Sequence, residues 1–298
     1  MIRVPTIEDY LTREAHPLRQ TGGCRRPGRG KDNLQMPLIT VVTIVRNRQE
    51  TLQQTITSVL DQSYKNIEYI IVDGASTDGT LEVIKKFDDK IDLWVSEPDS
   101  GTSDAFNKAI SMAEGDFIFG LSSDDWIEPS FIEAAAEIIS NTGADFIFGD
   151  MLMHDGQNSG KVYKGNPDYA KAIMSGWAYC FFPTMVIRRK CFQEIGLIDL
   201  AYKFVNDYDL VLRLHLNGAI GCYNNLLFVH RRVGGIGECY PVQSMLEHLR
   251  LLRKYRLPKS KAMCAYLYFF VRRGLGKLAK LIMPRAIYKT LKRVASGG

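Results

Sequence analysis

The chain has 298 residues, of which 46% are hydrophobic and 24% charged, with 25 glycines and 11 prolines. This composition is typical of a globular protein and excludes collagen-like, low-complexity disordered and disulfide-dense small proteins. The net charge of +5 is unevenly distributed: residues 37–247 contain 17 basic and 29 acidic side chains, whereas residues 248–298 contain fourteen Lys and Arg and no acid. We therefore expect an acidic folded body followed by a basic segment that seeks an anionic partner.

The cysteines and the apolar runs bear on the compartment in which the chain resides. The six cysteines are scattered without a C-x-x-C pair, and no long apolar run follows Met1. This pattern is typical of a reducing, cytoplasmic environment. The longest apolar stretch, residues 262–271, falls short of the roughly 20 residues that a spanning helix needs. We therefore expect no transmembrane segment.

The elements expected along the chain alternate between strands and helices. Residues 1–36 lack sustained periodicity and end in a Gly- and Arg-rich string, which predicts a flexible leader. The apolar, β-branched run at residues 38–45 is typical of a parallel strand buried on both faces. Helical spacing of apolar residues separates it from the further strands, which we expect at residues 67–73, 91–97, 116–122 and 145–150.

This alternation predicts an α/β fold with a mainly parallel central sheet flanked by helices. No linker divides residues 37–240, so we expect them to form one domain, followed by a helical appendage over residues 241–298. The appendage interleaves apolar side chains with Lys and Arg, which favours helices lying on an anionic membrane surface. The two alternatives for this segment are a helix packed on the folded body and a patch that binds nucleic acid. Of these partners we expect the membrane surface and not nucleic acid.

Acidic residues follow most of the predicted strands. Parallel sheets of this kind bind ligands at the carboxyl ends of their strands. An acidic crevice there suits a diphosphate only if a divalent cation lies between the two. Adjacent acids are also common in surface turns, so this alternative stays open for Asp124 and Asp125. The acids in question are Asp73, Glu97, Asp124, Asp125 and Asp150.

Three strings in this order resemble the family 2 glycosyltransferases, the inverting group with the GT-A fold. They read T-V-V-T-I-V-R-N-R-Q-E through V-D-G-A-S-T-D-G-T, then S-E-P-D-S-G-T-S-D-A-F-N-K-A through L-S-S-D-D-W, then V-N-D-Y-D-L-V-L-R-L. The resemblance covers residues 37–237. It implies transfer of a sugar from a nucleotide-diphosphate sugar to an acceptor hydroxyl.

The resemblance also implies which residues bind the donor. Asp73 could instead cap the turn that follows its strand, and Lys108 could be a solvated helix charge. The residues implied to hold the nucleoside are Thr43, Arg46, Asn47, Glu50, Asp73 and Ser76. Those implied to face the sugar diphosphate are Gly101, Asp104, Asn107 and Lys108, with Asp124 at the metal.

A metal site and a catalytic base follow from the same resemblance. The family's metal motif is a D-x-D or D-x-D-D string, of which Asp124 and Asp125 remain here while Ser122 replaces the leading acid. The implied ion is Mg²⁺ or Mn²⁺, with His230 as a third ligand or else a strand-edge residue. The family's base is the Asp of an E-D string that opens a helix, which implies Asp207, preceded here by Asn206. Asp207 could instead be a stabilising acid in a helix first turn.

The function expected from these features is an inverting glycosyltransferase of envelope polysaccharide biosynthesis. Its partners would be a nucleotide-diphosphate sugar, a glycan or lipid-linked acceptor, and the cytoplasmic face of the membrane, contacted through the basic segment. One alternative has polyprenyl phosphate as the acceptor. Another is a catalytically silent nucleotide-sugar-binding subunit, suggested by Ser122 and Asn206 at positions that are usually acidic.

Overall fold

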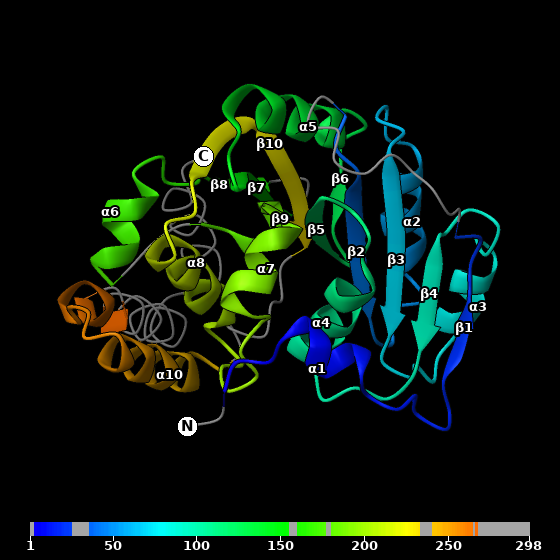
Figure 1. Ribbon diagram of the computed structural model, residues 1–298, viewed down its shortest axis with the longest axis horizontal. Coiled ribbons are helices and arrows are strands. Elements are labelled where there is room, and N and C mark those ends of the chain that lie inside the picture. Colours follow the sequence, from blue (N-terminus) through cyan, green and yellow to red (C-terminus); the bar gives the residue numbers. More distant parts are fainter. Residues whose placement is uncertain are drawn as a thin grey trace, which may run out of the picture.

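A mixed sheet forms the centre of the molecule (Figure 1). The computed structural model describes residues 3–25, 36–154, 160–176, 180–232, 240–264 and 266–267. Within these residues the sheet has ten strands in the order β1-β4-β3-β2-β5-β9-β7-β10-β6, with β8 paired to β7. The strands are β1 (Gln20–Gly22), β2 (Ile39–Val45), β3 (Ile67–Asp73), β4 (Leu93–Ser96), β5 (Phe117–Ser122), β6 (Trp126–Ile127), β7 (Phe146–His154), β8 (Gly160–Tyr163), β9 (Val186–Arg188) and β10 (Gly221–Arg232).

Helices cover both faces of this sheet, as the alternation in the sequence predicts. The predicted α/β fold with flanking helices is therefore confirmed, but the sheet is mixed and not mainly parallel, because β1, β6, β8 and β9 pair antiparallel with their neighbours. The helices are α1 (Ile7–Leu11), α2 (Leu52–Leu60), α3 (Thr80–Lys85), α4 (Thr102–Met112), α5 (Phe131–Thr142), α6 (Tyr169–Met174), α7 (Arg189–Ile195), α8 (Asn206–Leu216) and α10 (Pro241–Lys254), with a 3₁₀ turn at Phe182–Thr184.

Strand β2 is the centre of the parallel part of the sheet. All seven of its residues are buried, because β3 and β5 pair with its two edges and helices cover its two faces. Its side chains alternate between the faces: Val42 and Ile44 belong to the core that includes α4 and α8, and Val41 to the core that includes α2 and α5. The parallel register places the carboxyl ends of β2, β3, β4 and β5 at one edge.

In the second half of the sheet, strand β10 ends near this carboxyl edge. Strand β10 runs parallel to β7 and antiparallel to β6. The β6–β10 ladder pairs Ile127 with Val229 and Trp126 with His230. This pairing brings the end of β10 beside the turn that contains Asp124 and Asp125.

The expectation of a flexible leader is corrected for residues 3–25. Strand β1 pairs antiparallel with β4, and α1 lies beside α4 (Figure 1). No periodic pattern marks this segment, because single arginines that reach remote buried acids hold it in place. Arg19 donates to Glu97 at 2.7 and 3.0 Å, and Arg25 Nε donates to Glu68 at 3.1 Å.

The predicted C-terminal appendage is described only over its first part. Helix α10 packs on the body through the buried Leu251 and Leu252. Residues 268–298, on which most of the prediction for the basic segment falls, lie outside the described residues. Among the helices that are described, none combines the length and apolar character needed to cross a membrane.

The Arg19–Glu97 pair makes a testable contribution to stability. Burial would raise the pKa of Glu97, but hydrogen bonds from Arg19 and Lys108 outweigh it and lower the pKa from 4.5 to about 2. A carboxyl whose pKa is lowered by folding stabilises the fold above its unfolded pKa and loses that contribution as the pH falls toward its folded pKa. Glu97→Gln should therefore lower the free energy of unfolding by roughly 2–3 kcal/mol at pH 7.

The measurement is urea denaturation at pH 7 and at pH 4 or below. The difference between wild type and Glu97→Gln should shrink at the lower pH, whereas the exposed Glu14→Gln should match wild type at both. A difference that stays constant with pH would contradict the assignment.

Candidate active site

Two loops are tied together at the carboxyl edge of the sheet by Asn47. This residue has a φ of 53°, in the left-handed region that asparagine tolerates better than most residues. Its backbone amide donates to Ser76 Oγ at 2.8 Å, and its side-chain oxygen accepts from the amide of Thr77 at 2.9 Å. Arg46 and Glu50 are exposed beside it. The structure thus brings three of the predicted nucleoside residues to this edge, Arg46, Asn47 and Ser76, whereas Glu50 lines a groove along α2 with Gln53 and Ile127.

Asp73 holds the turn that follows β3. It is fully buried and accepts from Ser96 Oγ at 2.6 Å, from the backbone amide of Ser76 at 3.1 Å and from the Ser76 hydroxyl. These bonds are what the turn-capping alternative predicts. Asp73 therefore stabilises the turn at this edge, and its carboxylate is hydrogen-bonded to other residues of the chain.

Thr43 does not reach the edge, and its predicted contact with the nucleoside is corrected. Its side chain is fully buried, and its Oγ1 hydrogen-bonds with the Tyr69 hydroxyl at 3.1 Å. The residue lies two positions before the end of β2, and the alternation of the strand turns it into the core.

Asp99 is a residue at this edge that the sequence analysis missed. A Cβ added at Gly74 would lie 2.3 Å from Asp99 Oδ2 and 3.4 Å from Arg46 Cδ, so the three residues crowd together where only glycine fits. Asp99 Oδ1 accepts the amide of Gly101, whose φ of 119° suits glycine alone. The sequence signal that could have identified Asp99 is an acid that follows a strand and lies two residues before a glycine.

The three polar residues of α4 that were expected to face the sugar diphosphate are engaged elsewhere. Asp104 accepts from the Tyr10 hydroxyl at 2.7 Å. Asn107 is fully buried and bonds both backbone groups of Ile198 at 2.9 Å. Lys108 lies 2.9 Å from Glu97. Residues 3–25 and the chain near Ile198 supply partners that the sequence did not reveal, and a contact of these residues with the sugar diphosphate stays a prediction.

The turn after β5 carries the predicted metal-binding acids. Asp124 is partly exposed, whereas Asp125 is 1% exposed; among the described residues neither of its carboxylate oxygens has a hydrogen bond of good geometry, although the Arg232 amide and the Ser122 hydroxyl lie close enough to lower its pKa. Burial raises the pKa of Asp125 to about 7; Arg231 acts against this shift and Asp124 adds to it. A buried carboxylate without a partner is costly unless a cation or a proton compensates it. Two adjacent carboxylates also supply the hard oxygen donors that Mg²⁺ and Mn²⁺ prefer, so these residues fit such an ion.

His230, the predicted third ligand, contacts other side chains of the chain. Its Nδ1 lies 3.0 Å from His154 Nε2, its Nε2 lies 2.8 Å from Glu128, and its ring stacks on Trp126 at 5.0 Å. Among the described residues, no group of three or more His, Cys, Asp or Glu is placed to hold a metal. A ligand role for His230 stays a prediction; in this structure its Nδ1 faces His154 and its Nε2 lies near Glu128.

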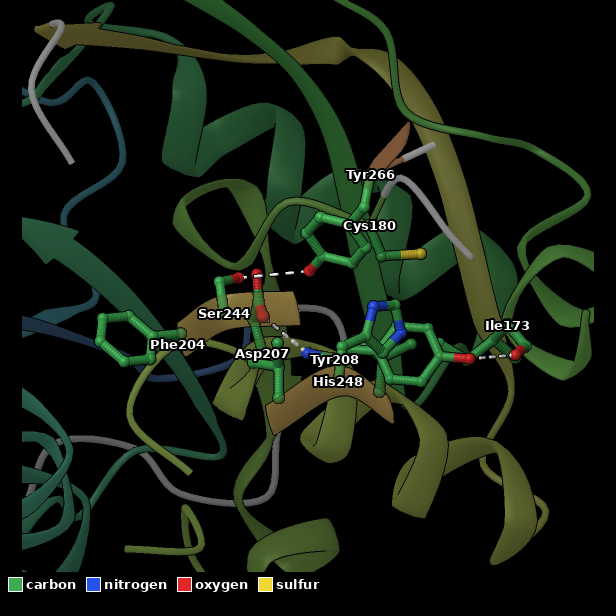
Figure 2. Close-up of a pocket in the computed structure, with 10 residues that line it drawn as sticks. Ile173, Cys180, Phe204, Asp207, Tyr208, Ser244, His248 and Tyr266 are labelled. Carbon is green, nitrogen blue, oxygen red and sulfur yellow. Dashed lines mark hydrogen bonds between the residues drawn. The ribbon is translucent and has the colours of Figure 1, made fainter. Parts of the chain in front are cut away.

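Asp207 lines a pocket of about 150 Å³ between α8, α6 and α10. Figure 2 shows its carboxylate pointing toward the side where Ser244 and Tyr266 meet in a hydrogen bond of 3.3 Å. Burial raises the pKa of Asp207, opposed by the Tyr208 amide and the charge of Arg231. Burial likewise lowers the pKa of His248, another wall residue, to about 4, so it is neutral at pH 7. A carboxylate of raised basicity in such a pocket is suited to accept a proton.

The neighbouring Asp209 has a structural role. It is fully buried, forms an ion pair of 2.7 Å with Arg213 and accepts from the Tyr255 hydroxyl at 3.3 Å. Arg213 in turn donates to the backbone carbonyls of Ile195 and Leu197. Asp209 is therefore the acid that stabilises the first turn of α8, whereas Asp207 faces the pocket.

Arg231 connects the two acidic groups. Its charge acts on both Asp125 and Asp207, lowering the pKa of each against the effect of burial. Arg232, next to it on β10, donates to the backbone carbonyl of Asp124 at 3.2 Å. The acid turn and Asp207 therefore both lie within the electrostatic reach of Arg231 at the end of β10.

Comparison with known proteins identifies the family to which the chain belongs. Residues 40–196, more than half of the chain, match the glycosyl transferase family 2 model. The chain belongs to glycosyl transferase family 2. An uncharacterised glycosyltransferase of Rickettsia prowazekii is 31% identical over 196 residues, which are 60% of this chain and 59% of that protein. The putative teichuronic acid biosynthesis glycosyltransferase TuaG of Bacillus subtilis is 36% identical over 115 residues, 38% of this chain and 46% of TuaG.

Solved structures extend the likeness to the fold. Staphylococcus aureus TarS residues 1–349 align with a TM-score of 0.56 and 19% identity, covering 72% of this chain and 64% of TarS. The mannosyltransferase PcManGT of Pyrobaculum calidifontis, solved with GDP-Man and Mn²⁺, aligns with a TM-score of 0.56 and 14% identity, covering 97% and 85%. The chain therefore has a GT-A-type fold, and it spans about three fifths or less of the curated relatives named above.

Asp99, in the loop after β4, and Thr43, buried within β2, allow a matched test of which residues bind the nucleotide. Asp99→Ala should weaken binding of UDP or GDP, measured by calorimetry with Mn²⁺, by roughly tenfold, the loss typical of one charged hydrogen bond. Thr43→Val should leave binding unchanged but lower the free energy of unfolding by about 1–2 kcal/mol, because the Tyr69 hydroxyl loses its partner. Weaker binding in Thr43→Val with full affinity in Asp99→Ala would reverse the assignment.

Proposed function

We propose that the chain is a metal-dependent inverting glycosyltransferase that moves a sugar from a nucleotide-diphosphate sugar to a hydroxyl of a glycan or lipid-linked acceptor. The observation that carries this proposal is the placement of two different acidic groups beside Arg231. One is the Asp124–Asp125 turn at the carboxyl edge, and the other is Asp207 in its pocket. An inverting transfer requires both: a site for the departing diphosphate and a base for the attacking hydroxyl.

The donor is assigned to the edge formed by Arg46, Asn47, Gly74 and Asp99. The bare backbone at Gly74 lets the side chains of Asp99 and Arg46 approach closely, and these groups offer an acceptor and donors for a base and ribose. TarS has been solved with UDP-GlcNAc and PcManGT with GDP-Man, which supports a nucleotide sugar as the class of donor.

The diphosphate is assigned to the turn after β5. Asp124 and Asp125 would hold Mg²⁺ or Mn²⁺, which when bound neutralises charge on the departing nucleoside diphosphate. Arg231 and Arg232 at the end of β10 add positive charge beside the same turn. The protein's own contribution is therefore a fixed set of charges that favours departure of the diphosphate.

The proton of the acceptor hydroxyl is assigned to Asp207. Its raised pKa makes the carboxylate a better base than an exposed aspartate while leaving it ionised above that pKa. The pocket walls include Phe204, Tyr208 and Val211, which limit access of water to the carboxylate. Attack from this side, opposite the departing diphosphate, would invert the anomeric carbon.

The acceptor and the location of the enzyme are proposed from surface chemistry. Helix α10 exposes Val242 and Leu246 together with Arg250 and Arg253, and the sequence beyond it remains basic and free of acids. Such a face fits anionic lipid headgroups on the cytoplasmic side of a membrane. TuaG is named for teichuronic acid biosynthesis, which supports a role in envelope polysaccharide assembly.

Asp207→Asn tests the base. The variant should lower kcat by roughly 10²–10⁴-fold, measured as release of nucleoside diphosphate in a screen of nucleotide sugars with Mn²⁺. The wild-type rate should rise with pH through the raised pKa of Asp207, and the variant should lose this dependence. The exposed Asp168→Asn is the matched control and should retain wild-type turnover.

The same screen separates the alternatives. Full activity in Asp207→Asn would favour a phosphate acceptor, which needs no deprotonated hydroxyl. Nucleotide binding without turnover of any donor would favour a silent binding subunit.

Asp124→Ala tests the metal site. UDP or GDP should raise the melting temperature of the wild type more with Mn²⁺ than with EDTA, and the variant should lose this metal-dependent increment because a carboxylate ligand is missing. Asp61→Ala removes an exposed acid at the end of α2 and should keep the increment. An unchanged increment in Asp124→Ala would contradict the site.

A further inference from the structure

Residues 3–25 form a segment that we call the N-terminal strap. It lies outside residues 40–196, which match the family. Its helix α1 begins with a capping box in which Thr6 and Asp9 bond each other, and it lies beside α4 (Figure 1). At the start of the strap, the carbonyl of Pro5 accepts the amide of Leu197 at 2.7 Å. The strap thus touches both the donor half and the chain that leads to α8.

The strap holds one buried carboxylate in the first turn of α4. Asp104 is 4% exposed, and its Oδ1 accepts from the Tyr10 hydroxyl at 2.7 Å and from Arg13 at 3.0 Å. The Arg13 guanidinium also lies over the Tyr10 ring at 3.9 Å. Burial would raise the pKa of Asp104, but these bonds and the Ser100 amide outweigh it, so the pKa lies below its usual value. Asp104 is therefore a charged anchor whose partners come mainly from outside its own helix.

From Asp104 the contacts lead to the donor edge. Its second oxygen, Oδ2, accepts the backbone amide of Ser100 at 3.0 Å. Lys108, one turn along α4, donates to the carbonyl of Pro98 at 2.9 Å. These two bonds fix the loop on both sides of Asp99, the acid that faces Gly74 and Arg46.

From the same turn of α4 the contacts also lead to the base. Ser103 Oγ accepts from the side-chain amide of Asn206 at 2.9 Å. The side-chain oxygen of Asn206 accepts the backbone amide of Asp207 at 2.9 Å. The first turn of α8, which carries Asp207, is thereby fastened to the first turn of α4.

We propose that Tyr10 and Arg13 are positioning residues that, through Asp104, set the Asp99 loop and the first turn of α8 at the same time. Donor edge and base then share one anchor, supplied by a segment outside the family match. The hydrogen bonds that join the strap to both loops are present whatever reaction the protein catalyses. The predicted effect on KM and kcat rests on the proposed function.

The test uses the full chain with Tyr10→Phe, Arg13→Met and the double variant. Tyr10→Phe keeps the buried ring and removes only the hydroxyl. Arg3→Met is the matched control, because Arg3 pairs with Asp9 inside the strap and not with α4. Hydrogen exchange should rise by roughly tenfold or more at residues 98–104 and 206–208 in the double variant, since each lost bond is to a charged group. Strands β2 and β3 should keep wild-type exchange.

Kinetics provide the second readout. With the donor identified by the turnover screen, Tyr10→Phe should raise the donor KM several-fold and lower kcat, while Arg3→Met leaves both unchanged. A purely structural role would lower the melting temperature alone. Increased exchange confined to residues 3–25, with unchanged KM and kcat, would overturn the proposal. If the wild type turns over no nucleotide sugar, the proposed function fails, and the exchange at residues 98–104 and 206–208 still decides the role of the strap.

Discussion

The short ladder between β6 and β10 constrains the whole site. Strand β6 begins one residue after Asp125, and its pairing with β10 places the acid turn beside the end of β10 that carries Arg231. Strand β10 reaches this position only because it runs along β7 as a parallel neighbour. The carboxyl edge of the first half and the α8 pocket of the second half therefore meet at one cationic strand end.

The buried acids fall into two groups, those that are paired and stabilise the fold and those that belong to the candidate site. Glu97, Asp104 and Asp209 are each buried against an arginine or lysine, and Asp150 accepts from the Tyr223 hydroxyl at 2.8 Å. Paired carboxylates of this kind fix the structure, since removing one partner leaves an uncompensated charge. Asp125 and Asp207 differ, because burial raises the pKa of both. Such groups are stable only where a ligand, ion or proton completes them.

Elements beyond the family match complete both sides of this arrangement. The N-terminal strap supplies the partners of Asp104 and Glu97, and residues from α10 to Tyr266 form one wall of the Asp207 pocket. The core of the fold positions the strand ends, while these added segments close the loops around them. Differences in such segments offer a physical route to different acceptors on one scaffold.

The order and character of the elements were determined by the sequence itself. The β-branched run at residues 38–45 predicts a buried parallel strand, and Asp73, Asp124 and Asp125 lie at the carboxyl edge as their places at strand ends predict, whereas Asp150 lies within β7. The direction of individual side chains was decided by tertiary packing. Thr43 turns inward, His230 meets His154 and Glu128, and Asp104 is bound by Tyr10, 94 residues away. Local patterns determine the period of a strand or helix, but a buried polar group bonds to whichever remote partner the fold brings within reach, and no local pattern encodes that partner.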